Sequence, residues 1–167
     1  MKTLLLLRHA KSSWKDSAVR DFDRPLNQRG LKAAPTIGRL MRKRKLQPDL
    51  VLSSPAERAR QTSQMVLEAA AFKTELRYDE RIYEASAARL FEIVSQIEDD
   101  ANVAMLVGHN PGLEELLEAL TGVGRSLSTA ALACIELDIE RWSKLRAGAN
   151  QLAWLVKPKE LKSSKPV

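Results

Sequence analysis

The chain contains two histidines, a residue type that can act as a nucleophile, an acid or a base near neutral pH. His9 and His109 each stand just beyond a short apolar run, residues 3–7 and residues 103–107. Continuous apolar runs of this length predict strands of a parallel sheet that is covered on both faces. Because ligands of open α/β sheets bind beyond the carboxyl ends of the strands, we expect both imidazoles to reach one crevice.

Two arginines are placed to share that crevice. Arg8 directly precedes His9, and Arg58 lies in the first turn predicted after a third apolar run, residues 50–52. Guanidinium groups match phosphoryl oxygens with paired hydrogen bonds and stay charged at any working pH. The start of the predicted helix after Ser54 would add free N–H groups and its positive dipole end. The pattern therefore predicts that Arg8, Arg58 and His109 bind a phosphoryl group beside His9.

The chemistry expected of this pocket needs no metal and no cofactor. The sequence has no glycine-rich phosphate loop ending in lysine, and no cluster of carboxylates or histidines at metal-binding spacing. A covalent intermediate on His9 would divide phosphoryl transfer into two easier steps. Neighbouring cations should hold His9 neutral and nucleophilic, while a bound dianion would help His109 to act as a charged donor.

Helical patterns alternate with the apolar runs. They cover residues 28–46, 55–71, 87–97 and 113–120, with Pro35 as a point from which the regular part of the first helix could begin. Residues 131–139 and 151–156 predict two further strands, joined closely enough to pair antiparallel. We therefore expect an α/β fold, a three-layer α/β/α sandwich with a mostly parallel central sheet and an antiparallel edge.

The length and composition indicate one soluble globular domain. We expect residues 1–157 to form it and residues 158–167 to be a basic, mobile tail. The single cysteine, Cys134, excludes an internal disulfide and suits an apolar core position. No apolar stretch approaches the roughly 20 residues that cross a bilayer. These features predict a cytoplasmic protein without a membrane partner.

The formal net charge is +6, and much of the excess lies in residues 39–45 and in the tail. A charged helix end and a solvated tail explain these segments. Aromatic residues are not interleaved with the charges, which disfavours nucleic acid as a partner.

Several motifs resemble the histidine phosphatase superfamily, which includes phosphoglycerate mutases and acid phosphatases. The family triplet Arg-His-Gly is similar to Arg8-His9-Ala10, and alanine in the third place resembles the branch of SixA-type phosphohistidine phosphatases. Further matches to that branch are Lys11-Ser12-Ser13-Trp14, Asp23-Arg24-Pro25-Leu26-Asn27-Gln28-Arg29-Gly30, Ser53-Ser54-Pro55 with Arg58 and Gln61-Thr62, Tyr83-Glu84-Ala85-Ser86, and Val107-Gly108-His109-Asn110-Pro111-Gly112. They run in the family order from Leu4 to about Gly122.

The resemblance implies a phosphoglycerate mutase-like fold and a phosphatase in which His9 is phosphorylated while Arg8, Arg58 and His109 bind and polarise the phosphoryl group. It makes Glu84 the candidate general acid, which an ester substrate needs more than a phosphohistidine does. The favoured substrate is therefore phosphohistidine on a protein, and a small phosphorylated molecule hydrolysed by a phosphomonoesterase is the alternative. A non-catalytic module on the same fold that binds anions or nucleic acid is the alternative from another class.

Other polar residues have structural interpretations. We expect Arg24 and Arg29 to tie loops to the domain, Ser53 and Ser54 to cap the following helix, and Trp14 to line the pocket entrance. Lys11 and Lys15 are expected to be solvated.

Overall fold

Six strands form one mixed sheet in the computed structural model, which describes residues 1–162. The strands are β1 (Lys2–Arg8), β2 (Leu50–Ser53), β3 (Glu75–Tyr78), β4 (Val103–Gly108), β5 (Leu132–Leu137) and β6 (Gln151–Val156). Their order is β3-β2-β4-β1-β5-β6. The first four in this order pair parallel, whereas β5 pairs antiparallel with both β1 and β6.

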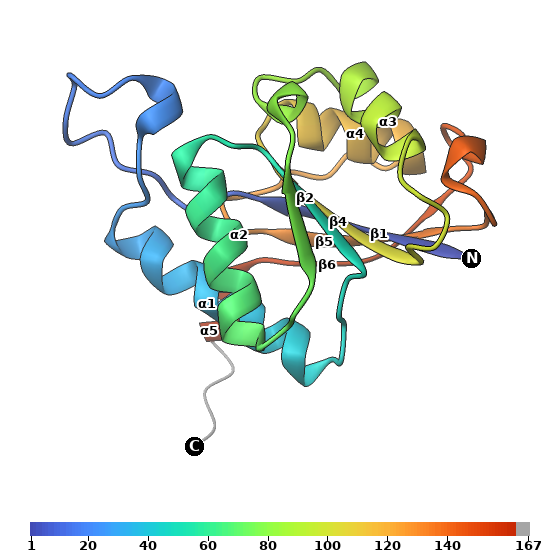
Figure 1. Ribbon diagram of the computed structural model, residues 1–167, viewed down its shortest axis with the longest axis horizontal. Coiled ribbons are helices and arrows are strands. Elements are labelled where there is room, and N and C mark those ends of the chain that lie inside the picture. The colour runs from blue at the N-terminus through green and yellow to red at the C-terminus, as the bar shows by residue number, and fades with distance from the viewer. Residues whose placement is uncertain (163–167) are drawn as a thin grey trace.

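Helices cover both faces of the sheet (Figure 1). The helices are α1 (Gln28–Lys43), α2 (Glu57–Ala70), α3 (Ala87–Ser95), α4 (Gly112–Thr121) and α5 (Pro158–Lys162). Leu4 and Leu6 of β1 pack in the core beneath α3 and α4, whereas Leu5 and Leu7 pack beneath α1 and α2. All four side chains are fully buried, and burial stabilises the fold by about 1.5–3 kcal/mol for each. The predicted three-layer sandwich, with a mostly parallel sheet and an antiparallel edge, is confirmed.

Three elements differ from the sequence-based expectation. The edge strand β3 was not predicted, because three of its four residues are exposed and it has no apolar run. Helix α1 begins at Gln28 and continues through Pro35, with the side chain of Asn27 accepting the N–H of Gly30 at its start. The segment expected to be a mobile tail from residue 158 begins with α5, because Leu161 packs against the core beside α1. Residues 163–167 of that tail lie outside the described residues.

Close packing of α1 on α2 depends on Gly38. A Cβ atom at this position would lie 2.4 Å from the carbonyl oxygen of Val66 and 2.8 Å from the Cβ atom of Ala69. Only glycine lets the two helix backbones approach so closely.

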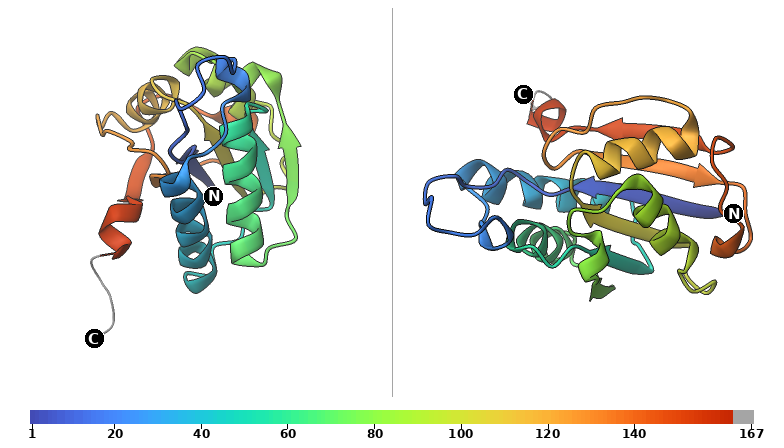
Figure 2. Two further views of the ribbon diagram at one scale, coloured as in Figure 1. Left: turned by 90° about the vertical axis from the view of Figure 1, so that its left-hand side faces the viewer. Right: turned by 90° about the horizontal axis from the view of Figure 1, so that it is seen from above.

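Residues 9–27 form a long connection that extends past the carboxyl end of β1 and is coloured blue in Figure 2. An isolated bridge between Ser12 and Leu26 closes its base. The backbone N–H of Asn27 donates to the carbonyl oxygen of Lys11 at 2.9 Å. The connection also contains a short 3-10 turn, Asp21–Asp23, and it returns to the body of the domain beside α2. No helix in the part of the chain that the structure describes is long and apolar enough to span a membrane.

Candidate active site

The register of the sheet places the two histidines side by side. Arg8 of β1 pairs with Gly108 of β4, so the next residues, His9 and His109, leave neighbouring strands at the same level. Their ring centroids lie 5.1 Å apart. The predicted convergence of the two imidazoles is therefore present.

A backbone contact fixes the tautomer of His9. The ring is buried, and its Nδ1 lies 2.7 Å from the carbonyl oxygen of Ala10. A carbonyl only accepts, so Nδ1 carries the proton and Nε2 keeps its lone pair. Burial lowers the pKa of His9 to about 4, helped by the cationic Arg58 and Arg8, although the hydrogen bond to Ala10 acts in the opposite direction. The imidazole is therefore neutral at neutral pH.

His109 is held by a serine from the neighbouring strand end. Its Nε2 lies 2.7 Å from the Oγ atom of Ser54, which also accepts the backbone N–H of Ala56 at 3.2 Å. Burial lowers the pKa of His109 to about 3, with His9 and Arg58 acting in the same direction. The Nδ1 atom of His109 is buried and has no hydrogen-bond partner among the described residues.

Arg58 is fixed from the protruding connection by Asp21. Its Nη1 donates to the Asp21 carbonyl oxygen at 2.7 Å, and its Nη2 donates to Asp21 Oδ2 at 3.1 Å. The same Oδ2 accepts the hydroxyl of Tyr83 at 2.6 Å, while Arg24 Nε and Nη2 each donate to Oδ1 at 3.1 Å. The Tyr83 hydroxyl, Arg58 and Arg24 together lower the pKa of Asp21 to about 2. Burial, followed by the Asp21 carboxylate, raises the pKa of Tyr83 to about 12.

Arg8 is fixed from the opposite side, by the loop that precedes β5. Its Nη1 donates to the carbonyl oxygen of Leu127 at 3.1 Å, and Asn110 Nδ2 donates to the same oxygen at 2.8 Å. The carboxylate of Glu114 accepts the N–H of Leu127 at 2.6 Å and so holds this loop in place. The Nε atoms of Arg8 and Arg58 are buried without a hydrogen-bond partner in the part of the chain that the structure describes.

A cavity of about 520 Å³ adjoins the site, and neither His9 nor Arg8 is among the residues that line it. Arg58 and His109 form part of its wall, together with Tyr83, Glu84 and Glu115. Glu84, the candidate acid, is exposed and has a left-handed backbone conformation with a φ of 54°. The cavity therefore combines the guanidinium of Arg58 with three acidic residues on its wall, Asp21, Glu84 and Glu115.

Other residues of the protruding connection support the site indirectly. Arg24 is buried and donates to Ser12 Oγ at 2.6 Å, in agreement with the structural role predicted for it. Trp14 does not line this cavity. Its ring lies over the Arg24 guanidinium at 3.5 Å, and 76% of the residue is exposed.

The contacts of Asp21 with Arg58 and of Ser54 with His109, and the hydrogen bond from Tyr83 to Asp21, were not predicted from the sequence. Ser54 was expected to cap a helix, and its contact with Ala56 is of that kind, but its shorter contact is with His109. The acidic pair Asp21 and Asp23 next to Arg24 was the available signal for a clamp on an arginine.

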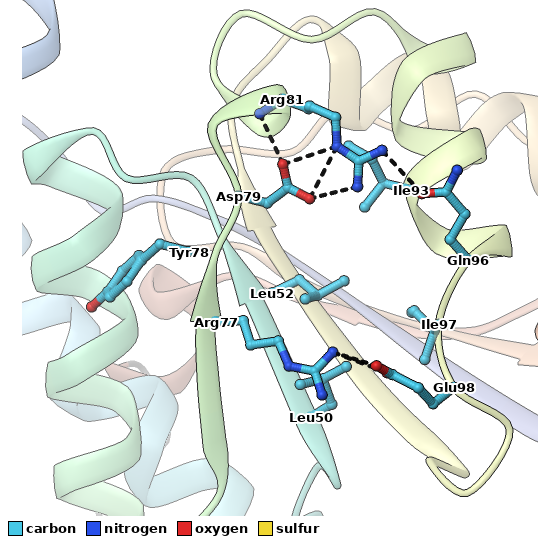
Figure 3. Close-up of a pocket in the computed structure, with 10 residues that line it drawn as sticks. All are labelled: Leu50, Leu52, Arg77, Tyr78, Asp79, Arg81, Ile93, Gln96, Ile97 and Glu98. Atoms are coloured by element: carbon cyan, nitrogen blue, oxygen red, sulfur yellow. Dashed lines mark hydrogen bonds and ion pairs between the residues drawn. The ribbon is translucent and has the colours of Figure 1, made fainter.

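A second cavity, of about 170 Å³, lies beside β3 and has a different character (Figure 3). Arg81 binds Asp79 and Gln96 there, while Arg77 binds Glu98. Each of these cations faces a carboxylate partner, so this cavity does not provide the unneutralised positive charge that a phosphoryl group needs.

Comparison with known proteins identifies the family. The model of the histidine phosphatase superfamily (branch 1) matches residues 4–99. The chain belongs to this superfamily. An uncharacterised chloroplastic protein of Arabidopsis thaliana is 31% identical over 92% of this chain and 74% of its own length.

Solved structures of histidine phosphatases share the fold. A candidate phosphohistidine phosphatase SixA from Agrobacterium tumefaciens is 32% identical, with a TM-score of 0.82, over 94% of this chain and 98% of its own. A second SixA candidate, from Nakamurella multipartitia, is 30% identical, with a TM-score of 0.79, over 94% and 96%. The predicted SixA-type branch and phosphoglycerate mutase-like fold are confirmed, and the protein is a phosphatase.

Proposed function

We propose that this histidine phosphatase hydrolyses phosphohistidine on a protein substrate, without a metal, through a phosphoryl group carried on His9. The observation that carries the proposal is the state of His9, whose Nδ1 proton is donated to the Ala10 carbonyl so that Nε2 is left as an unprotonated nucleophile. Neutral imidazole attacks phosphorus only through a free lone pair. Arg8 and Arg58 supply positive charge around the transferring group, and His109 adds a hydrogen-bond donor.

The reaction proceeds in two displacements. Nε2 of His9 forms a bond to phosphorus while the bond from phosphorus to the substrate nitrogen breaks, and its electron pair stays on that nitrogen. A substrate imidazole that carries a proton on its other nitrogen leaves as neutral imidazole. Water then attacks phospho-His9, which releases inorganic phosphate and returns His9 to its starting state. The Nε atoms of Arg8 and Arg58 and the Nδ1 atom of His109 are buried without a hydrogen-bond partner among the described residues, and phosphoryl oxygens would supply partners for them.

The cavity beside the site favours a nitrogen leaving group. Its volume of about 520 Å³ admits an imidazole ring with the backbone that carries it. Glu84 and Glu115 on its wall place negative charge where the leaving group departs. These carboxylates suit a neutral or cationic leaving group and repel an anionic one.

A small phosphate ester is the second candidate substrate, and the position of Glu84 favours it. Glu84 lines the same cavity as His109 and Arg58, where a carboxylic acid could protonate an alkoxide. Glu84→Gln separates the candidates. We expect little change in kcat/KM on a phosphohistidine peptide and a severe loss on an alkyl phosphate ester such as glycerol phosphate, whose alkoxide must be protonated as it leaves. Equal losses on both substrates, or faster wild-type turnover of esters than of phosphohistidine, would overturn the preference for phosphohistidine.

The enzyme proposal also has a direct test against the binding-module alternative. A wild-type protein that hydrolyses neither substrate, while His9→Ala retains binding of an oligonucleotide, would support the module. A cytoplasmic location stays a prediction, and the buried Cys134 is compatible with a reducing compartment.

A further inference from the structure

A second large cavity, of about 550 Å³, lies outside the catalytic cavity and has a strongly basic lining. Four cationic side chains and two hydroxyl side chains contribute to it, namely Lys11, Arg29, Lys157, Lys159, Ser128 and Thr129. These residues come from four separate segments: the connection after β1, the first turn of α1, the loop before β5, and the junction of β6 with α5. The tertiary fold therefore gathers charges that are scattered in the sequence.

The positive charge of this basic cavity is not neutralised within the described residues. None of its four cations forms an ion pair there, whereas arginines at other positions, such as Arg60 and Arg77, do. No carboxylate of residues 1–162 lines the cavity. An anionic ligand would therefore meet no repulsive side chain on its walls.

The basic cavity adjoins the strand end that carries the nucleophile. Lys11 is two residues beyond His9, a backbone distance of at most about 7 Å. The N–H of Ala130, which follows Thr129, donates to the carbonyl oxygens of Arg8 at 3.0 Å and of His9 at 3.1 Å. One wall of the cavity is thus hydrogen-bonded to the backbone of the catalytic pair.

We propose that the basic cavity binds an acidic segment of the phosphorylated protein substrate while the phosphohistidine of that substrate reaches His9. This inference rests on the proposed function. Lysine and arginine side chains bind the carboxylates of aspartate and glutamate in partner proteins. Electrostatic complementarity of this kind sets the specificity and the association rate of protein binding. Nucleic acid is the less suitable polyanion, because none of the described residues that line the cavity is an aromatic one that could stack on a base.

Binding of a fluorescein-labelled hexaglutamate peptide, followed by fluorescence anisotropy, tests the proposal without catalysis. The test variant is Lys157→Glu/Lys159→Glu, and Lys159→Glu alone serves if the double variant is unfolded by circular dichroism. The matched control is Arg42→Glu/Lys43→Glu, which makes the same change in net charge at the other end of α1, about 20 Å along the helix from Arg29 of the basic cavity. We expect the test variant to bind at least tenfold more weakly and the control to stay within twofold of the wild type.

Equal binding by the wild type and the test variant would overturn the proposal. Tighter wild-type binding of oligothymidylate than of hexaglutamate, with the same sensitivity to the variant, would assign the cavity to nucleic acid and would also overturn it.

Kinetics connects the basic cavity with turnover. The wild type should have a higher kcat/KM on a phosphohistidine peptide flanked by glutamates than on one flanked by lysines, mainly through KM, and the test variant should lose this preference. A preference that survives charge reversal contradicts the proposal. Failure of the wild type to hydrolyse phosphoimidazole or either peptide would instead reject the proposed function, and the anisotropy result would still decide whether the cavity binds acidic chains.

Discussion

Asp21 binds Arg58 twice, with its backbone carbonyl oxygen at 2.7 Å from Nη1 and its carboxylate at 3.1 Å from Nη2. A residue on a protruding connection therefore sets the orientation of a cation that lies beside both histidines. Tyr83 and Arg24 bind the same carboxylate. We call this arrangement of Asp21 with Arg58, Tyr83 and Arg24 the clamp, and it joins three segments of the chain around one negative charge.

Removing that charge should loosen the clamp. We expect Asp21→Asn to lower kcat/KM by about tenfold, because hydrogen bonds to a charged group contribute about 1.5–3 kcal/mol and the backbone contact to Arg58 remains. Ultraviolet titration should also show that the pKa of Tyr83 falls from about 12 toward its ordinary value. The fall should be partial, because burial is the largest cause of the raised pKa and remains in the variant.

Asp23→Asn is the matched control for this change. Asp23 pairs only with Arg20 among the described residues, and both side chains are largely exposed. It should leave kcat/KM and the tyrosine titration unchanged. If Asp21→Asn and Asp23→Asn lowered kcat/KM equally, the negative charge of the loop as a whole, and not the contact of Asp21 with Arg58, would account for the loss of activity.

Both histidines should stay neutral well below the pH at which histidine ordinarily becomes charged. Burial holds the pKa of His9 at about 4 and that of His109 at about 3, against about 6.5 in an unfolded chain. Nitrogen chemical shifts of ¹⁵N-labelled imidazoles should show neutral rings at pH 5.5. Since the chain has only two histidines, the variant His109→Asn assigns both signals.

The same shifts set the sign of the pH dependence of stability. Below about pH 6.5 the unfolded chain binds protons that the folded imidazoles do not, so the free energy of unfolding should decrease as pH falls from 7 toward 4. Urea titrations at several pH values measure this. Stability that increases over this interval would show that the folded histidines are protonated.

Ser54 should act by positioning His109. We expect Ser54→Ala to lower kcat/KM by about fivefold to tenfold, since it removes a hydrogen bond contributing about 1 kcal/mol and leaves His109 Nε2 unpaired. The control is Ser63→Ala, a buried serine of α2 that binds Ser53 and the Ala59 carbonyl oxygen. It should lower stability but keep kcat/KM. A wild-type kcat/KM for Ser54→Ala would show that Ser54 does not position His109 for the reaction.

Gly38 should be essential to the packing of α1 on α2. We expect Gly38→Ala to reduce the free energy of unfolding by about 2 kcal/mol, because contact with the Val66 carbonyl outweighs the higher helix propensity of alanine. Gly124→Ala is the control, since a Cβ atom there comes no closer than 3.6 Å to another group. Urea unfolding should show a change within about 0.5 kcal/mol for the control. Equal stabilities of the two variants would show that the helices can separate at little cost.

The four basic residues could be located from the sequence because each follows a strand end that an apolar run marks. Arg8 is the last residue of β1, His9 and His109 directly follow β1 and β4, and Arg58 lies in the first turn of α2 after β2. Parallel pairing then brings these ends together, as the register of β1 and β4 shows. Their convergence could therefore be predicted without knowing the conformation of any loop.

The groups that hold these residues could not be predicted in the same way. Asp21 reaches Arg58 only because residues 9–27 fold back, and that return depends on contacts such as Ser13 N–H to the Pro25 carbonyl oxygen at 2.8 Å. Such contacts leave no periodic pattern. The edge strand β3 was missed for a related reason, because the ion pair of Arg77 with Glu98 and its pairing with β2 stabilise it in place of apolar burial.

Trapping the covalent intermediate tests the central claim most directly. Wild-type protein is mixed with phosphoimidazole, quenched in alkali and digested, and the phosphorylated peptide is located by mass spectrometry. The proposal predicts phosphate on His9, none in His9→Asn, and a loss of turnover of about a thousandfold or more in that variant. Phosphate on His109 or Ser54, or turnover by His9→Asn near the wild-type rate, would contradict it.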